Sequence, residues 1–270
     1  MNRLAVRFDK LAKESRKGLV TYLVAGDPDA AATVELMHAM VAGGADVIEL
    51  GMPFTDPIAD GPTIQAACER ALAAGTGIKD MFGIVRTFRE KDSDTPIVLM
   101  GYLNPLESIG YETFADQAVA AGADAVLVVD LPVEEAEEIS AVLADRALQS
   151  VFLVSPTTRD DRLARISEAA TGFVYYVSLK GVTGAGGSDP EAMASQVGKI
   201  REAASVPVGI GFGISDAESA VKAAGAADAV IIGSAIVRHI AEQGAAATGE
   251  IRQFVSGVRR ALDEMNVPTG

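Results

Sequence analysis

Eight short runs of hydrophobic residues recur along the chain, and longer stretches rich in alanine, glutamate and arginine separate them. Three of these runs resemble one another: GGADVIELG at 43–51, AGADAVLVVD at 121–130 and GAADAVIIG at 225–233. Each combines a glycine that ends a helix, a short Ala-Asp link and a continuously hydrophobic strand. Strands that are hydrophobic on both faces are typical of a parallel sheet covered by helices.

The other five strands are expected at 18–27, 95–102, 149–156, 172–178 and 206–213. Regular alternation of eight strands with helices predicts an α/β fold, a closed (β/α)8 TIM barrel. The spacing of Leu4, Phe8 and Leu11 predicts an extra amphipathic helix at the N-terminus. No linker or change of composition interrupts the pattern, so we expect residues 1–270 to form one barrel domain.

Composition narrows the choice of partners and location. A net charge of −14 disfavours nucleic acid and anionic membranes, and no hydrophobic run reaches 18 residues. The N-terminal stretch lacks a secretory hydrophobic region, and the single cysteine fits a reducing compartment, so a cytoplasmic protein is expected. A small phosphorylated substrate remains compatible with this charge, because backbone amides at helix N-termini bind phosphate.

Two carboxylates stand out after the second predicted strand. Glu49 lies inside the hydrophobic run VIELG, and Asp60 follows on a loop bounded by prolines and glycine. Active sites of TIM barrels lie at the C-terminal ends of the strands, where burial would raise the pKa of Glu49 and suit it to proton transfer. The alternative is a glutamate paired with arginine, but no arginine lies near another predicted strand exit. For Asp60 the alternative is an ordinary turn before a helix.

Glycines follow the last three predicted strands and indicate a phosphate site. The stretches GFGIS (211–215) and GSAIV (233–237) place Gly213 and Gly233 at strand exits, where Ser215 or Ser234 can cap the next helix. Barrels frequently bind phosphate at this pair of loops. The glycine-rich segment 179–190, which contains Gly184, is long enough to form a lid.

Other residue types point to the substrate by their placement. Tyr22, Tyr102, Tyr175 and Phe212 fall at strand exits and indicate a pocket for a flat apolar group. Both histidines fall on predicted helices, so a histidine-ligated metal is disfavoured. No lysine lies within a predicted strand, which disfavours a Schiff-base aldolase.

Taken together, the motifs resemble those of one family. ELGMPFTDPIADGPTIQ, MGYLNP, VDLP, SPTT, GVTGA and GFGIS occur in this order in the tryptophan synthase alpha subunit family, and the resemblance covers essentially the whole chain. It implies a carbon–carbon lyase that cleaves indole-3-glycerol phosphate into indole and glyceraldehyde 3-phosphate. It further implies a beta subunit that uses pyridoxal phosphate, an alpha2-beta2 complex, and no cofactor or metal on this chain.

The resemblance also assigns roles to individual positions. Glu49 matches the general acid/base, Asp60 the carboxylate that faces the indole N–H, and Tyr175 a residue at the reacting centre. The remaining matches are Tyr22, Met100, Leu127, Thr183 and Phe212 for substrate; Gly184, Gly213, Gly233 and Ser234 for phosphate; and Pro53, Asp56, Asn104 and Pro132 for the partner surface.

Two alternatives remain. Another phosphate-binding barrel, an isomerase or synthase of the same pathway, would need a cysteine or lysine at a strand exit, and neither is found there. A catalytically silent barrel that serves as a regulatory subunit is the second, and the presence of both Glu49 and Asp60 argues against it.

Overall fold

A computed structural model describes residues 2–177, 190–211 and 213–265. Eight parallel strands close into a barrel in chain order, each hydrogen-bonded to the next and β8 to β1. The strands are β1 (Gly18–Val24), β2 (Val47–Gly51), β3 (Ile97–Gly101), β4 (Ala125–Val128), β5 (Gln149–Val154), β6 (Val174–Val177), β7 (Val208–Gly211) and β8 (Ala229–Ile232). The TIM barrel predicted from the sequence is confirmed.

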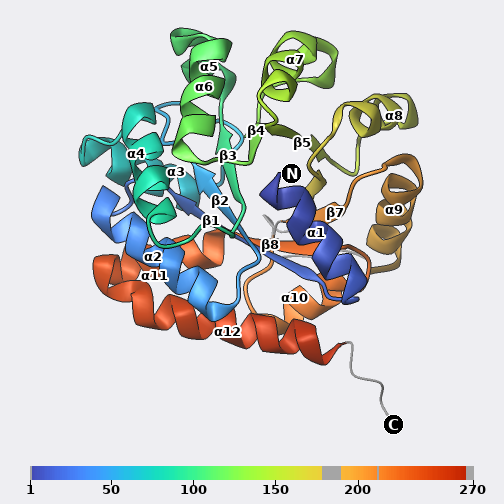
Figure 1. Ribbon diagram of the computed structural model, residues 1–270. Coiled ribbons are helices and arrows are strands. Elements are labelled where there is room, and N and C mark those ends of the chain that lie inside the picture. The colour runs from blue at the N-terminus through green and yellow to red at the C-terminus, as the bar shows by residue number, and fades with distance from the viewer. Residues whose placement is uncertain (1, 178–189, 212, 266–270) are drawn as a thin grey trace.

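Helices surround the barrel (Figure 1). They are α1 (Arg3–Lys13), α2 (Ala30–Gly43), α3 (Pro62–Ala73), α4 (Ile78–Arg89), α5 (Leu103–Ile109), α6 (Tyr111–Ala121), α7 (Glu137–Asp145), α8 (Asp160–Ala169), α9 (Pro190–Ala203), α10 (Ala217–Ala224), α11 (Ser234–Gln243) and α12 (Thr248–Glu264). Short 3-10 turns precede α7 and α12. None of the helices in the described ranges is long and hydrophobic enough to cross a membrane.

The alternation is less regular than the sequence pattern suggested, because two connections contain two helices each. Between β2 and β3, α3 and α4 are separated at Gly75, and between β3 and β4, α5 and α6 are separated at Gly110. Both glycines have positive φ angles (82° each), a conformation that stops a helix without steric cost. The extra helices α3 and α5 directly follow the strand exits where the candidate site lies.

The N-terminal helix α1 closes one end of the barrel, as Figure 1 shows from that end. Its buried residues Leu4, Phe8 and Leu11 pack in one cluster with residues that point into the barrel, among them Phe173 and Ala229. This is the helix that the spacing of its hydrophobic residues predicted. It excludes water from the end of the barrel opposite to the candidate site.

The aspartate of each repeated Ala-Asp link ties neighbouring strands together at the N-terminal end of the barrel. The carboxylates of Asp46, Asp124 and Asp228 accept hydrogen bonds of 2.9 Å from the backbone N–H groups of Leu19, Ile97 and Val208, respectively. The backbone N–H of each aspartate donates in return to the carbonyl of the same residue. Each repeated Ala-Asp link therefore marks a strand staple, by which we mean an aspartate whose hydrogen bonds tie two neighbouring strands together.

Each of these aspartates also binds an arginine from a surrounding helix. The partners are Arg259 of α12 for Asp46, Arg89 of α4 for Asp124 and Arg201 of α9 for Asp228, each at 3.0 Å. Two of the pairs are largely buried, since the Asp46 and Asp124 side chains are 5% and 3% exposed. Charge at this end of the barrel is therefore compensated.

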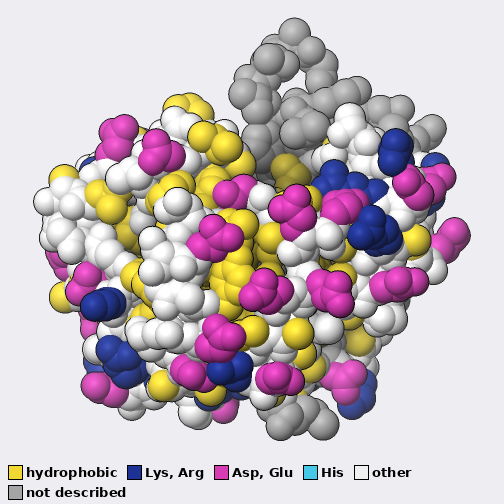
Figure 2. Space-filling model, turned by 90° about the horizontal axis from the view of Figure 1, so that it is seen from above, with side chains coloured by type: hydrophobic (Ala, Val, Ile, Leu, Met, Phe, Trp, Pro, Cys, Tyr) yellow, Lys and Arg dark blue, Asp and Glu magenta, His cyan; other side chains and the backbone are white. Residues whose placement is uncertain are grey.

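The outer surface reflects the acidic composition. Figure 2 shows acidic side chains spread over one side of the molecule, with hydrophobic surface visible between them. The acidic residues include Glu134, Glu135, Glu137 and Glu138, which lie in and just before α7. Such a surface repels polyanions, in agreement with the partners that the net charge disfavoured.

We predict that Asp124→Ala lowers the free energy of unfolding by about 3 kcal/mol or more, because it removes the carboxylate that balances the charge of Arg89 and leaves the Ile97 N–H without its acceptor. Urea denaturation measures the change. Asp9→Ala is the matched control, since Asp9 pairs with Lys13 where both side chains are more than 70% exposed. Its loss should cost less than about 1 kcal/mol. Equal effects of the two variants would contradict the staple.

Candidate active site

Glu49 lies on the face of β2 that points into the barrel, between Val47 and Gly51. Its side chain is 1% exposed, and its Oε1 atom has no hydrogen-bond partner among the described residues. A buried polar atom without a partner is costly in a folded protein and calls for an explanation. The site therefore holds a buried carboxyl group, one oxygen of which has no partner among the described residues.

Burial dominates the electrostatics of this group. Desolvation, followed by the nearby negative charge of Asp60, raises the pKa of Glu49 to about 8. At neutral pH the carboxyl is therefore mostly protonated and can donate a proton. A pKa close to the working pH also allows the same group to take a proton back.

Asp60 lies on the loop between β2 and α3, directly before the helix-starting pair Gly61 and Pro62. Its Oδ2 accepts a hydrogen bond of 2.8 Å from the hydroxyl of Tyr102, and its backbone carbonyl accepts one of 2.8 Å from the Gln65 side chain. Burial raises the pKa of Asp60, and the Tyr102 hydrogen bond opposes that shift. The loop thus returns to the barrel mouth and brings a second carboxylate into the field of Glu49.

Tyr22 and Tyr175 stand on the inner face of β1 and β6 on either side of this centre. A side chain at Gly51 would collide with the Tyr22 hydroxyl, and one at Gly211 with the Tyr175 hydroxyl. Burial and the negative charges of Glu49 and Asp60 raise the pKa of both tyrosines far above its usual value. Both hydroxyls therefore remain protonated and can donate hydrogen bonds, while the two rings border the site.

Hydrophobic side chains complete the described surroundings of Glu49. Leu127 of β4 is fully buried in the cluster that fills the barrel interior, and Met100 of β3 packs against both that cluster and the one around Tyr22. These positions suit a flat apolar ligand. Three residues predicted for the site, Thr183, Gly184 and Phe212, lie outside the described residues, as does most of the expected lid segment.

The two loops expected to bind phosphate differ in how their helices begin. At α10 the N-cap is Asp216, whose carboxylate accepts from the Ser219 N–H, so Ser215 is not the cap that the sequence suggested. At α11 the N-cap is Gly233, and no side chain caps the helix. The N-terminal N–H groups of α11 are therefore the better place for an anion, next to exposed Ser234.

Gly213 belongs to the same region but contributes differently. It lies in the loop between β7 and α10, is exposed and has a φ angle of 76°, which a side chain would strain. Because it has no side chain, Gly213 allows a ligand to approach its backbone closely.

An arginine does reach a strand exit, contrary to the expectation from the sequence. Arg70 of α3 forms two hydrogen bonds, of 2.8 and 2.7 Å, with the carboxylate of Asp27, which follows β1 and is fully buried. The pairing occupies Arg70, and no cationic side chain among the described residues acts on Glu49. Arg70 lies on α3, well after the end of β2 in the sequence. The pattern of strands therefore did not indicate that its side chain would reach the exit of β1.

The residues expected at a partner surface are not equally accessible. Asp56 and Asn104 are exposed and Pro132 is half-buried, but Pro53 is buried within this chain. Ile58, which sequence reasoning missed, is 82% exposed on the same loop as Asp56. A large hydrophobic side chain between two aspartates in DPIAD was the available signal.

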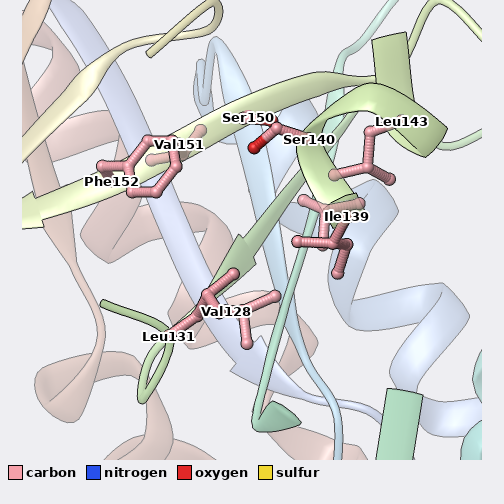
Figure 3. A pocket seen from close by; sticks show the side chains of 9 residues that line it. Val128, Leu131, Ile139, Ser140, Leu143, Ser150, Val151 and Phe152 are labelled. Atoms are coloured by element: carbon pink, nitrogen blue, oxygen red, sulfur yellow. The ribbon is translucent and has the colours of Figure 1, made fainter. Parts of the chain in front are cut away.

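Other chemistry finds little support in the described ranges. No group of three or more His, Cys, Asp or Glu in them is arranged to hold a metal ion. A small cavity lies between β4, β5 and α7, lined by residues such as Leu131, Ile139 and Ser150 (Figure 3). None of the candidate site residues lines it, so it is a packing feature outside the barrel interior.

Comparison with known proteins gives consistent matches. The family model described as tryptophan synthase alpha chain matches residues 8–266. The tryptophan synthase alpha chain of Nitrosococcus oceani is 52% identical over 264 residues, 98% of this chain and 97% of that protein. The crystal structure of tryptophan synthase subunit alpha from Legionella pneumophila has a TM-score of 0.92 at 43% identity, covering 98% of this chain and 99% of that one. A structure described as the tryptophan synthase a2b2 complex from Pyrococcus furiosus has a TM-score of 0.85 at 41% identity, covering 90% and 98%.

We predict that Glu49→Gln stabilises the protein increasingly as pH rises from 4.5 to about 8. Below this window the carboxyl is protonated in both the folded and unfolded states and costs nothing; within it, folding opposes ionisation. The gain of the variant should approach about 1.4 kcal/mol for each pH unit at most.

Urea unfolding of both proteins across that range measures the difference. Glu90→Gln, at an exposed glutamate, should show no such trend. A stability difference for Glu49→Gln that does not change with pH would show that this carboxyl is not desolvated.

Proposed function

The chain belongs to the tryptophan synthase alpha chain family, and from this premise we infer that it cleaves indole-3-glycerol phosphate to indole and glyceraldehyde 3-phosphate. It acts as the alpha subunit together with a beta subunit in an alpha2-beta2 complex, for tryptophan biosynthesis. The observation that carries the mechanism is a buried, mostly protonated Glu49 with one oxygen free, beside Asp60.

The reaction requires that one carbon of the substrate gain a proton and that one of its oxygens lose a proton. Protonation of the indole ring at the carbon that bears the side chain places positive charge on the ring nitrogen. The neighbouring glycerol hydroxyl then loses its proton, the C–C bond breaks with its electron pair returning to the ring, and the aldehyde forms. We propose that Glu49 gives the first proton and, once ionised, takes the second.

Asp60 has the complementary role. A carboxylate near the ring N–H forms a charge-assisted hydrogen bond that strengthens as the ring becomes cationic, which stabilises the transition state more than the substrate. Among the described residues no arginine or lysine acts on the pKa of Asp60, which supports this role, because a cation there would oppose the developing charge. Tyr175 borders the same centre with a protonated hydroxyl.

The remaining parts of the proposal follow from the site and the family. Tyr22, Met100, Leu127 and Phe212 enclose the indole; Gly184, Gly213, Gly233 and Ser234 hold the phosphate; and Thr183 belongs to the closing lid. Asp56, Asn104 and Pro132 contact the beta subunit, with Pro53 supporting them from within the loop. The lyase step needs no metal and no cofactor on this chain, and pyridoxal phosphate is expected only on the beta subunit. We also propose a cytoplasmic location and a single domain over residues 1–270.

The test of the mechanism is indole release from indole-3-glycerol phosphate by wild type and Glu49→Gln, each with and without the beta subunit. Glutamine keeps the shape of the side chain but transfers no proton, so the rate should fall at least ~100-fold. Glu90→Gln should retain the wild-type rate. Near-full activity of pure Glu49→Gln would contradict the assignment of the acid/base.

A second prediction concerns the phosphate. Ser234→Asp places a negative charge at the first position of α11, where it suits the helix dipole but repels a bound phosphate. The KM for indole-3-glycerol phosphate should rise at least ~10-fold, while cleavage of the dephosphorylated substrate should be unaffected. Ser234→Asn, similar in size but neutral, is the control. Equal losses with both substrates would place the phosphate elsewhere.

A further inference from the structure

We propose that Tyr102 is a positioning residue for Asp60, through which the exit of β3 sets the orientation and charge of that carboxylate. This rests on the proposed function, in which Asp60 is the group that faces the indole N–H. Tyr102 was noticed in the sequence only as one of several aromatic residues at strand exits. The contacts around it assign it a more specific task.

One hydroxyl group holds two adjacent residues of the β2–α3 loop. The Tyr102 hydroxyl donates to Asp60 Oδ2 at 2.8 Å and accepts from the backbone N–H of Ala59 at 3.1 Å. These two bonds fix both the main chain and the carboxylate of the loop relative to the strand exit. Any displacement of the tyrosine ring therefore displaces Asp60.

The ring itself is firmly held. Tyr102 is 3% exposed, and Phe54, at the start of the same loop, stacks on it with ring centroids 5.3 Å apart and planes inclined by 29°. A stacked, buried aromatic ring has little rotamer freedom. The hydroxyl is consequently a rigid reference point for the loop, whose Asp60 carbonyl also accepts from the Gln65 side chain.

The same bond favours the charged form of Asp60. Burial raises the pKa of this carboxyl, and the hydrogen bond from Tyr102 acts in the opposite direction. The other described groups that interact with Asp60 are not cations; they are Glu49, Tyr22, Tyr175 and Cys68. Tyr102 remains a donor, because burial and Asp60 itself raise the pKa of its hydroxyl.

Tyr102 also joins the segments expected at the partner surface. It is the N-cap of α5, whose second residue is Asn104, and the backbone N–H of Leu103 donates to Asp130 Oδ1 at 2.8 Å. Asp130 lies two positions before Pro132 in the loop after β4. Contacts made by a beta subunit on these segments, or on the loop around Phe54, would therefore act on Tyr102, whose hydroxyl donates to Asp60.

The decisive variant is Tyr102→Phe, which keeps the ring and its stacking but removes the hydroxyl. We expect kcat for indole release to fall about 10- to 100-fold, the range for loss of a hydrogen bond to a charged group, with little change in KM. Removing the bond raises the pKa of Asp60, so the acidic limb of the kcat–pH profile should move to higher pH. A purely structural role would shift neither this limb nor the balance between kcat and KM.

Tyr111→Phe is the matched control. The Tyr111 hydroxyl also donates to a carboxylate, Glu107 Oε1 at 3.0 Å, but this bond is on the surface and away from Asp60. Its loss should leave kcat and the pH profile unchanged. If Tyr102→Phe behaves like this control while wild type cleaves the substrate, the positioning role is wrong; if wild type releases no indole, the proposed function itself fails.

Asp130→Ala tests the link to the partner at an exposed position, where loss of folding is not expected. Freeing the Leu103 N–H should reduce the rate enhancement that the beta subunit gives by several-fold, with a smaller effect on the isolated chain. An unchanged enhancement would overturn the connection between the partner surface and Tyr102. This variant decides that connection even if Tyr102→Phe does not fold.

Discussion

The structure depends on keeping one carboxyl group, that of Glu49, away from water inside the barrel. Its raised pKa requires that no solvent reach it from the N-terminal end of the barrel and that no cation lie beside it. The helix α1 and the hydrophobic layer that includes Val47 and Leu127 meet the first condition. Within the described residues the second is met, because Arg70 forms two hydrogen bonds with Asp27 rather than with Glu49.

A group of this kind lowers the stability of the fold, and the opposite end of the barrel offsets that cost. There, Asp46 and Asp124 are buried as well, but each accepts hydrogen bonds from the backbone of a neighbouring strand and pairs with an arginine. Burial of a carboxyl group thus has different consequences at the two ends of the barrel, depending on whether a cation pairs with it. The paired carboxylates hold the strands together, and the unpaired carboxyl of Glu49 stays mostly protonated and available for proton transfer.

Much of the fold followed from periodicity, because strand and helix patterns are local properties of the chain. The eight strands, the N-terminal helix and the unusual carboxyl within VIELG were all visible in the sequence, and the Ala-Asp links were visible as a repeat. Their role as strand staples was not, since it depends on which backbone group each aspartate meets in space. The contact between Tyr102 and Asp60 was hidden for the same reason: 42 positions separate the two residues, and only the path of the β2–α3 loop brings them together.

The acidic character of the site also explains how the substrate must be held. Glu49 and Asp60 favour a ring that becomes positive but repel a phosphate, so the two ends of the substrate need different environments. A lysine or arginine beside the phosphate would spread positive potential toward the ring, where it would oppose the developing cation. Backbone N–H groups at the uncapped start of α11 bind an anion with a field that falls off within about one helical turn. In the proposed mechanism, a phosphate bound at this helix end would therefore leave undisturbed the negative potential around the indole, which stabilises the developing cation.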